Sequence, residues 1–305
     1  MVALAPKLAA LAPRLAVPAP KAADLLGPVR GAGIGLRRRH FSEILEHERT
    51  LDFLEIIPEN YVGKGGRYLH MLDACAERWP ILAHGVSMSI GGPDPLDHEY
   101  LAALRQLLDR IDAPFYTDHL CFATLGGRTT FDLLPLPFNE AAVRHTAARV
   151  RELADALDRP IALENISYYA QMPSSELDEG AFVSAVIEEA DCLLLLDVNN
   201  VFVNARNHDL DPSELLWQLP VERACQIHLA GHKLEGPRLL DNHGAPVCDE
   251  VWALYREVIE RRGPCPTLIE WDTQIPALDA VLDQADLARA IIDKRQLDRL
   301  DRGQA

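Results

Sequence analysis

The stretch NEAAVRHTAARVRELADALDRPIALEN, residues 139–165, contains the repeating unit from which the fold is predicted. Its first part has apolar residues at the three- and four-residue spacing of an amphipathic helix, with Asn139 at the expected N-cap position. These apolar residues are Val143, Ala147, Val150, Ala154 and Leu157. A short apolar run follows, as expected for a buried strand. We therefore predict a helix over residues 139–157 and a strand over residues 161–168.

The same alternation of apolar run and amphipathic stretch continues in both directions along the chain. A second helical pattern, for example, covers residues 97–112. Eight repeats of strand and helix predict an α/β fold, a single closed (β/α)8 TIM barrel. A doubly wound sheet is the alternative, and it is disfavoured because no GxGxxG motif follows the first run. The eight runs are residues 31–36, 52–58, 81–90, 115–122, 161–168, 192–203, 225–231 and 267–272.

The composition of the 305 residues is that of a globular protein, with 48% hydrophobic and 25% charged residues. A net charge of -16 argues against nucleic acid as a partner. No apolar run approaches the roughly 20 residues that span a bilayer, prolines interrupt any signal-peptide core, and six cysteines without a CxxC pair favour a reducing environment. We expect a cytoplasmic protein without membrane contact, in which a catalytic barrel (29–293) lies between a disordered Ala/Pro-rich extension (1–28) and a charged tail (294–305).

Metal-binding types of side chain end six of the eight predicted strands. In a parallel barrel the carboxyl ends of all strands meet at one rim, where active sites form. The six residues are His84, His119, Glu164, Asp197, His228 and Glu270. Because strand side chains alternate in direction, each can point inward only if the residue two positions earlier also does. Those earlier residues are Leu82, Thr117, Ala162, Leu195, Gln226 and Leu268, of which Gln226 fits a barrel interior least well.

Three further candidate ligands, His208, Asp241 and His243, lie in segments that we predict to be loops after the sixth and seventh strands. Nine ligands are too many for one ion, which takes three or four from the protein, and suit two or three ions. Cations would also relieve the repulsion among close carboxylates. Imidazole and carboxylate without thiolate suit iron, manganese or zinc. An ordinary polar role is the alternative for each residue taken singly.

Other polar residues near the rim are expected to support the ligands or to contact substrate. Salt bridges are an equally open role for the two glutamates among them, which lie at the end of the second strand. These residues are Glu55, Glu59, Asn60, Asn165, Asn200 and His232.

Seven motifs, in order along residues 31–293, resemble those of the multinuclear non-haem iron-dependent oxidases, the family related to the methanobactin biosynthesis oxidase. They are LEIIPENY (54–61), LAHGVSMSIGG (82–92), YTDHLCF (116–122), LENISYY (163–169), LLDVNNVFVNARNH (195–208), QIHLAGH (226–232) and LIEWD (268–272).

The resemblance implies a TIM barrel that binds two or three iron ions in mixed Fe(II)/Fe(III) states and uses O2 as co-substrate. It implies modification of cysteine residues in a ribosomally made precursor peptide, often with a small partner protein that engages the leader segment. Glu164, Asp197 and His228 are the predicted catalytic residues, with Glu164 a bridge between ions. The ligands that the resemblance implies are His84, His119, Glu164, Asp197, His228, Asp241, His243 and Glu270.

Two other functions are open on the residues alone. One is a divalent-metal-dependent isomerase or endonuclease on a xylose-isomerase-like barrel. An enzyme acting on phosphate normally needs basic residues, and this rim offers few beyond Arg206, Lys233 and Arg238. The other is a noncatalytic metal-binding protein.

Overall fold

The computed structural model describes residues 27, 29–301 and 303, and in it eight parallel strands close into a barrel. Their order around the barrel is β1, β12, β9, β8, β7, β4, β3 and β2. Barrel strands that follow one another along the chain therefore lie side by side in the sheet. The predicted single (β/α)8 barrel is confirmed. Its strands are β1 (Ala32–Gly35), β2 (Leu54–Ile56), β3 (Ile81–His84), β4 (Tyr116–His119), β7 (Ile161–Glu164), β8 (Leu193–Asp197), β9 (Ala224–Leu229) and β12 (Thr267–Ile269).

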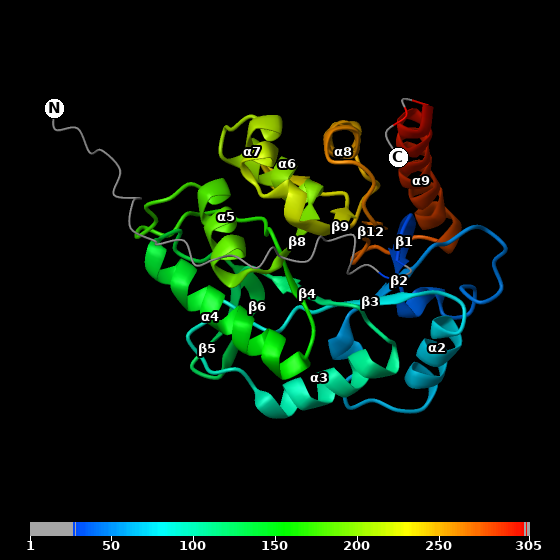
Figure 1. Cartoon of the computed structure of the whole chain (residues 1–305), viewed down its shortest axis with the longest axis horizontal. Coiled ribbons are helices and arrows are strands. Elements are labelled where there is room, and N and C mark those ends of the chain that lie inside the picture. The colour runs from blue at the N-terminus through cyan, green and yellow to red at the C-terminus, as the bar shows by residue number, and fades with distance from the viewer. Residues whose placement is uncertain (1–26, 28, 302, 304–305) are drawn as a thin grey trace.

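Helices surround the strands (Figure 1). Asn139 caps α4 as expected, because its side chain accepts a hydrogen bond from the Ala142 N–H at 3.0 Å. Asp97 caps α3 in the same way. The helices are α2 (Arg67–Ala76), α3 (His98–Arg110), α4 (Glu140–Leu157), α5 (Glu179–Ala190), α6 (Val198–Asn207), α7 (Pro212–Gln218), α8 (Asp249–Arg261), α9 (Leu278–Asp301), and the short η1 (Arg38–His40), η2 (Pro58–Asn60) and η3 (Val221–Arg223).

Two antiparallel hairpins are inserted where barrel strands end. The first, β5 (Phe122–Leu125) with β6 (Arg128–Leu134), follows β4. The second, β10 (Lys233–Glu235) with β11 (Arg238–Leu240), follows β9. Both therefore belong to the carboxyl-terminal rim of the barrel.

A small apolar cluster distinct from the main core supports the expected inward direction of the ligands. It contains Leu82, Ala162, Leu195 and Leu268, each two residues before a candidate ligand on its strand. Strand alternation then places those ligands on the same inner face, one layer nearer the rim. Gly33 leaves room for this layer, because a Cβ there would lie 2.6 Å from the ring of another cluster member, Phe53.

The strands are shorter than the apolar runs that predicted them. The run 192–203 ends as a strand at Asp197, because the Asp197 carboxylate caps α6 by accepting from the Asn200 N–H. His208 therefore stands at the end of a helix and not on a loop as predicted. Helix α9 continues to Asp301, past the boundary at residue 293, since no proline or glycine interrupts that stretch.

The six cysteines are free, and five of them are buried. Among the described residues, no helix has the length and apolarity needed to cross a membrane. The expected extension 1–28 lies, except for residue 27, outside the described residues.

Candidate metal centre

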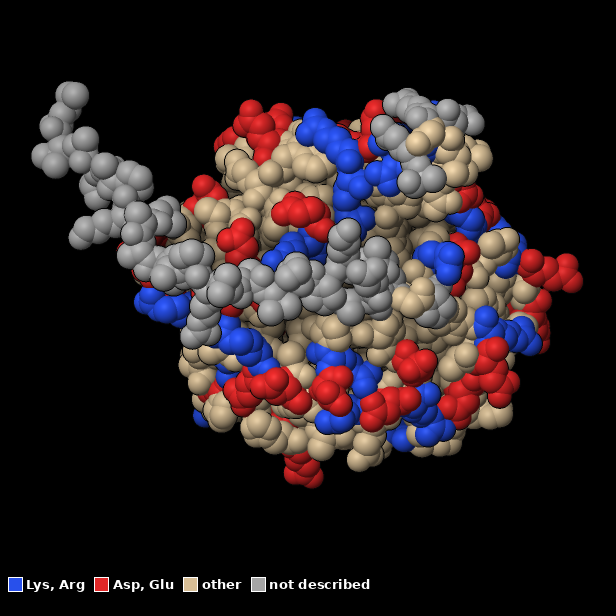
Figure 2. Space-filling model, viewed as in Figure 1, with Lys and Arg blue, Asp and Glu red and all other residues tan. Residues whose placement is uncertain are grey.

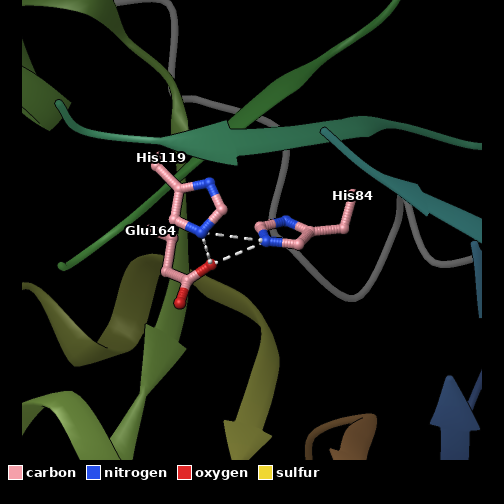
Figure 3. Close-up of side chains that lie close together, drawn as sticks. All are labelled: His84, His119 and Glu164. Atoms are coloured by element: carbon pink, nitrogen blue, oxygen red, sulfur yellow. Dashed lines mark hydrogen bonds and ion pairs between the residues drawn. The ribbon is translucent and has the colours of Figure 1, made fainter. Parts of the chain in front are cut away.

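Three strand-end side chains meet at the rim: His84 from β3, His119 from β4 and Glu164 from β7 (Figure 3). The two imidazole Nε2 atoms are 3.3 Å apart, and Glu164 Oε2 lies 3.0 Å from that of His84 and 3.4 Å from that of His119. All three side chains are buried. Two nitrogens and one oxygen therefore face a common point, which is a donor set suited to a divalent transition metal.

Hydrogen bonds behind the two rings direct their Nε2 atoms to this point. His119 Nδ1 lies 3.1 Å from the Gly85 carbonyl oxygen, which can only accept, so Nδ1 carries a proton. His84 Nδ1 lies 2.8 Å from the Thr117 hydroxyl, which itself donates to the Ala83 carbonyl. That hydroxyl therefore accepts from His84 Nδ1. When the rings are neutral, the protons are on Nδ1, and both Nε2 lone pairs are free to bind a metal. Hydrogen bonds commonly fix the tautomer of metal-binding histidines in this way.

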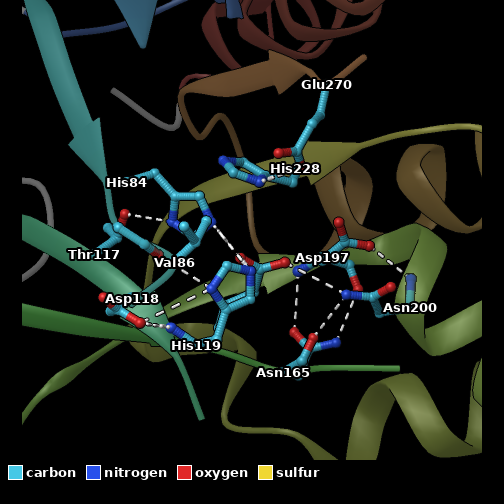
Figure 4. A network of polar contacts seen from close by, with 12 residues as sticks. His84, Val86, Thr117, Asp118, His119, Asn165, Asp197, Asn200, His228 and Glu270 are labelled. Atoms are coloured by element: carbon cyan, nitrogen blue, oxygen red, sulfur yellow. Dashed lines mark hydrogen bonds and ion pairs between the residues drawn. The ribbon is translucent and has the colours of Figure 1, made fainter. Parts of the chain in front are cut away.

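Glu164 also belongs to a second group of ligand atoms. Glu164, Asp197, His228 and Glu270 each offer one atom, and these atoms all lie within 4.8 Å of one another. Figure 4 shows the network around them. The rings of His84 and His228 are 5.0 Å apart, so the two groups adjoin. A carboxylate shared by adjoining groups is placed to bridge two ions.

Asn165 and Asn200 lie behind the carboxylates and hold Asp197 in place. Asn165 accepts from the Asp197 N–H at 3.0 Å and donates to the Asp197 carbonyl at 2.9 Å. The Asn200 N–H donates to Asp197 Oδ1 at 2.6 Å, and the Asn200 side-chain amide lies 3.4 Å from Glu164 Oε1. Asp197 Oδ2 is left facing the centre.

Glu55 acts on the centre through His228. His228 Nδ1 lies 3.0 Å from Glu270 Oε2, while its Nε2 lies 3.2 Å from Glu55 Oε2. Gln226, the expected misfit in the barrel interior, donates to the same Glu55 oxygen at 2.6 Å. Glu55 can therefore accept the Nε2 proton of His228, which leaves Nδ1 as the atom that faces the ligand group.

A third group lies beside the second and shares Glu270 with it. Ligand atoms of His243, Glu270 and Asp272 lie within 4.8 Å of one another. His243 Nε2 is also 2.6 Å from Asp241 Oδ1. Asp241 Oδ1 also accepts a hydrogen bond from the side-chain amide of Asn199 at 2.9 Å. The loop residues Asp241 and His243 are thus brought to the strand-end cluster.

His208 is not brought to the cluster. Its Nε2 lies 3.0 Å from the Tyr168 carbonyl, its ring stacks on the Tyr168 ring, and it belongs to none of the groups found among the described residues. The structure thus places His208 at the C-terminal end of α6, beside Tyr168, and its role as a ligand stays a prediction. Asn60 is exposed and does not line the cavity at the centre.

The two remaining predicted residues have supporting contacts. Glu59 accepts hydrogen bonds from the N–H groups of Val86 and Ser87, so it holds the loop after β3. His232 Nδ1 lies 2.8 Å from Asn199 Oδ1, so His232 orients the amide that binds Asp241.

The ionisation of the cluster favours added positive charge. Burial by itself would lower the pKa of His84, but the Glu164 carboxylate outweighs it and raises that pKa to about 9. Burial opposes protonation of His228 and His243 too, yet neighbouring carboxylates raise the pKa of each well above its ordinary value. Burial, reinforced by the Glu164 charge, raises the pKa of Asp197. Protons thus accumulate where a cation would otherwise neutralise the carboxylates.

The residues fit a cluster of metal ions. Asp197 Oδ2 is buried and has no hydrogen-bond partner in the described part of the chain. Two other buried atoms, Glu164 Oε2 and His243 Nε2, have other candidate ligands as their near polar contacts, His84 Nε2 at 3.0 Å and Asp241 Oδ1 at 2.6 Å. Buried polar atoms without a partner are rare and costly, and coordination to a cation would satisfy all three.

Two residues beside the centre were not found from the sequence. Arg37 Nη2 lies 2.7 Å from Asp272 Oδ1 and 3.7 Å from Glu270 Oε1. Asp272 ends the LIEWD motif and so carried a weak signal. Nothing in the sequence around Arg37 distinguishes it from the neighbouring arginines.

A cavity of about 800 Å3 opens onto the ligand groups, and its wall includes His84, His119, Glu164 and Glu270. Much of the rest of the wall is apolar, from the β5–β6 hairpin and from the segment after β7. These wall residues include Phe131, Leu133, Tyr168, Tyr169 and Met172.

Residues 31–293 match the family described as the RiPP precursor modification enzymes MbnB/TglH/ChrH, where RiPP denotes a ribosomally synthesised and post-translationally modified peptide. The chain belongs to this family. The resemblance inferred from the motifs is confirmed, and the family is one of enzymes that modify precursor peptides.

Relatives in this family extend over nearly the same span. A UPF0276 protein of Acaryochloris marina is 45% identical over 260 residues, which cover 85% of this chain and 94% of the relative. A UPF0276 protein of Pseudomonas aeruginosa is 43% identical over 265 residues, which cover 86% and 93%.

Solved structures support the fold. An L-ribulose 3-epimerase matches with a TM-score of 0.56 at 12% identity and covers 90% of this chain and 97% of its own. The 3-keto-D-glucoside 4-epimerase of E. coli matches with a TM-score of 0.56 at 14% identity and covers 86% and 99%. At 12–14% identity, these matches show only that this chain shares the barrel fold with the two epimerases.

Proposed function

We propose that the chain is an O2-dependent oxidase that uses a cluster of two or three iron ions to modify cysteine residues of a ribosomally made precursor peptide. Cysteine is the electron donor and O2 the electron acceptor. Glu164, Asp197 and His228 are the proposed catalytic residues, because as ligands they would lie against the reacting atoms. Bound iron would supply one-electron redox chemistry together with affinity for thiolate and for O2.

The observation that carries this proposal is the sharing of carboxylates between adjoining ligand groups. Glu164 belongs to both the His84–His119 group and the Asp197–His228 group, and Glu270 connects the latter to His243. Shared carboxylates favour a multinuclear centre over a single ion, and the mixture of imidazole and carboxylate suits iron. Family membership supplies the peptide-modifying role.

The cavity is large enough for a cysteine together with its neighbouring residues. Pockets of about 300–1,000 Å3 accommodate drug-sized ligands, so a cavity of about 800 Å3 leaves room for residues that flank a cysteine. Phe131 on the β5–β6 hairpin is 92% exposed and lines this cavity. Its φ of +57° is unfavourable for a bulky residue, and such strain is typical of residues held in place for function. We propose that Phe131 packs against the peptide.

An endonuclease function is less well supported. No Lys or Arg is among the described residues that line the cavity. Lys233 instead pairs with Glu235, and Arg238 donates to the Tyr169 carbonyl. A phosphodiester substrate would lack cationic partners there. On the face shown in Figure 2, Lys and Arg side chains are interspersed with acidic ones, as expected for a protein that does not bind nucleic acid.

The test combines metal analysis with peptide modification. The chain is purified without O2, given excess ferrous salt, and its iron content is measured. In a second experiment, the chain is co-expressed in air with a Cys-containing precursor peptide encoded beside its gene. The co-expression is done with and without the small leader-binding partner protein that we propose. We expect two or three irons per chain, O2 consumption and a mass change confined to cysteine. Zinc uptake with hydrolysis or sugar isomerisation, or a peptide whose mass never changes, would refute the proposal.

The proposed location is the cytoplasm, since six free cysteines suit a reducing compartment. Secretion of the chain in its native host would contradict this.

A further inference from the structure

A chain of contacts connects Arg37 to the third ligand group. Arg37, which follows β1, is buried, and its Nη2 donates to Asp272 Oδ1 at 2.7 Å. The other oxygen of that carboxylate, Asp272 Oδ2, lies 2.9 Å from His243 Nδ1. The Asp272 N–H also donates to the His243 carbonyl at 2.9 Å. Guanidinium, carboxylate and imidazole thus form a continuous series that ends at a candidate ligand.

The series determines which nitrogen of His243 faces the cluster. An ionised carboxylate can only accept, so Asp272 Oδ2 receives the Nδ1 proton of His243. The opposite nitrogen, Nε2, is buried and lies 2.6 Å from Asp241 Oδ1. The two candidate ligand atoms, His243 Nε2 and Asp241 Oδ1, are therefore close enough to bind one cation.

Arg37 is held firmly enough to fix this geometry. Its Nε donates to the Trp271 carbonyl at 3.2 Å, so the guanidinium has a second partner besides Asp272. Gly35 makes room for the group, because a Cβ at that position would lie 2.7 Å from the guanidinium carbon. A planar guanidinium with two fixed partners positions a carboxylate more precisely than an ammonium group can.

We propose that Arg37 and Asp272 are positioning residues that orient His243 so that its Nε2 completes the third cation site with Asp241. This inference rests on the proposed metal cluster and adds residues that act through a ligand. Carboxylate partners of metal-bound histidines fix the ring and its tautomer, and their loss typically weakens metal binding by about 10–100-fold.

A competing arrangement makes the opposite prediction for Arg37. If Asp272 were itself a ligand, as its place in a group with His243 and Glu270 would allow, the adjacent guanidinium would repel the ion. Removal of the Arg37 charge would then strengthen binding at the third site. If Arg37 instead holds Asp272 as a positioning group, its removal weakens binding there.

The experiment titrates ferrous iron anaerobically into the wild type, Asp272→Asn, Arg37→Gln and Arg37→Lys. Iron per chain is determined by elemental analysis, and the iron environments by Mössbauer spectroscopy. The matched control is Arg110→Gln, which removes an arginine from an exposed two-point ion pair with Asp73.

We expect Asp272→Asn and Arg37→Gln to lose the weakest-bound iron and its spectral component, with the remaining components unchanged. Arg37→Lys should retain part of the binding, and Arg110→Gln all of it. Circular dichroism identifies any variant that fails to fold, and the Arg37→Lys result then decides.

Tighter binding of the last iron in Arg37→Gln would overturn the proposal, and so would full iron occupancy in Asp272→Asn. Failure of the proposed function is distinguishable, since the wild type itself would then take up no iron.

Discussion

Metal binding at neutral pH should release protons from the cluster. The Glu164 carboxylate, against the opposing effect of burial, raises the pKa of His84 to about 9. Because pH 7 lies below that value, His84 should be largely protonated in the metal-free protein. A cation that binds His84 Nε2 must displace this proton, so we expect about one proton released from His84 alone.

The same competition sets the sign of the pH dependence. As the pH rises from 7 toward 9, fewer protons have to be displaced, so affinity should increase about tenfold per pH unit for each proton released. Above the pKa of His84 this contribution should level off. His228 and His243, whose pKa values are also raised against burial by neighbouring carboxylates, should make the dependence steeper.

Isothermal titration of zinc or anaerobic ferrous ions, in two buffers with different enthalpies of protonation, measures the number of protons released. A second series at several pH values gives the slope. No proton release together with a flat affinity between pH 7 and 9 would refute the reasoning, because His84 would then be neutral beside Glu164.

Three further predictions concern single side chains. Glu164→Gln should reduce iron content by more than one ion per chain and product formation by more than about 100-fold, since both ligand groups lose an anionic ligand; elemental analysis showing unchanged iron would contradict this. Phe131→Ala should raise KM for the precursor peptide about tenfold, at unchanged iron content, while Leu125→Ala, exposed on the same hairpin but not part of the cavity wall, should leave KM unaltered. Gly33→Ala should destabilise the barrel by about 1–3 kcal/mol in urea unfolding, because its Cβ would lie 2.6 Å from a buried ring, whereas Gly65→Ala, with open space around it, should have little effect; equal stability of the two variants would argue against tight packing at Gly33.

The sequence was sufficient to predict the barrel because the two patterns that indicate its strands and helices are local. Apolar runs and helical spacing depend only on neighbouring residues, and eight strands found this way are the eight strands of the barrel. The positions of His84, Glu164 and Glu270 followed from the same periodicity. Side chains two residues apart on a strand lie on the same face, so each of these residues faces inward together with the apolar residue two positions earlier. The motifs around them also identified the family.

Strand ends were less predictable than strands. Asp197 lies in an apolar run that continues for six more residues, and only its contact with the Asn200 N–H shows that a helix starts there. Helical geometry then carries His208 to Tyr168 and away from the cluster. Asp241 and His243, by contrast, come from a loop after a hairpin, and periodicity says nothing of where a loop returns.

The sequence by itself determined the fold, the family and the strand-end positions of the candidate ligands, because each depends on short-range patterns of polarity and spacing. The tertiary structure alone decided that Glu164 and Glu270 are shared between ligand groups, that Glu55 orients His228, and that Arg37 reaches Asp272 across 235 residues of chain. Those contacts depend on barrel closure, which brings β1 beside β12. Hydrogen bonds act over about 3 Å, so only the closed barrel, and no pattern along the chain, establishes them.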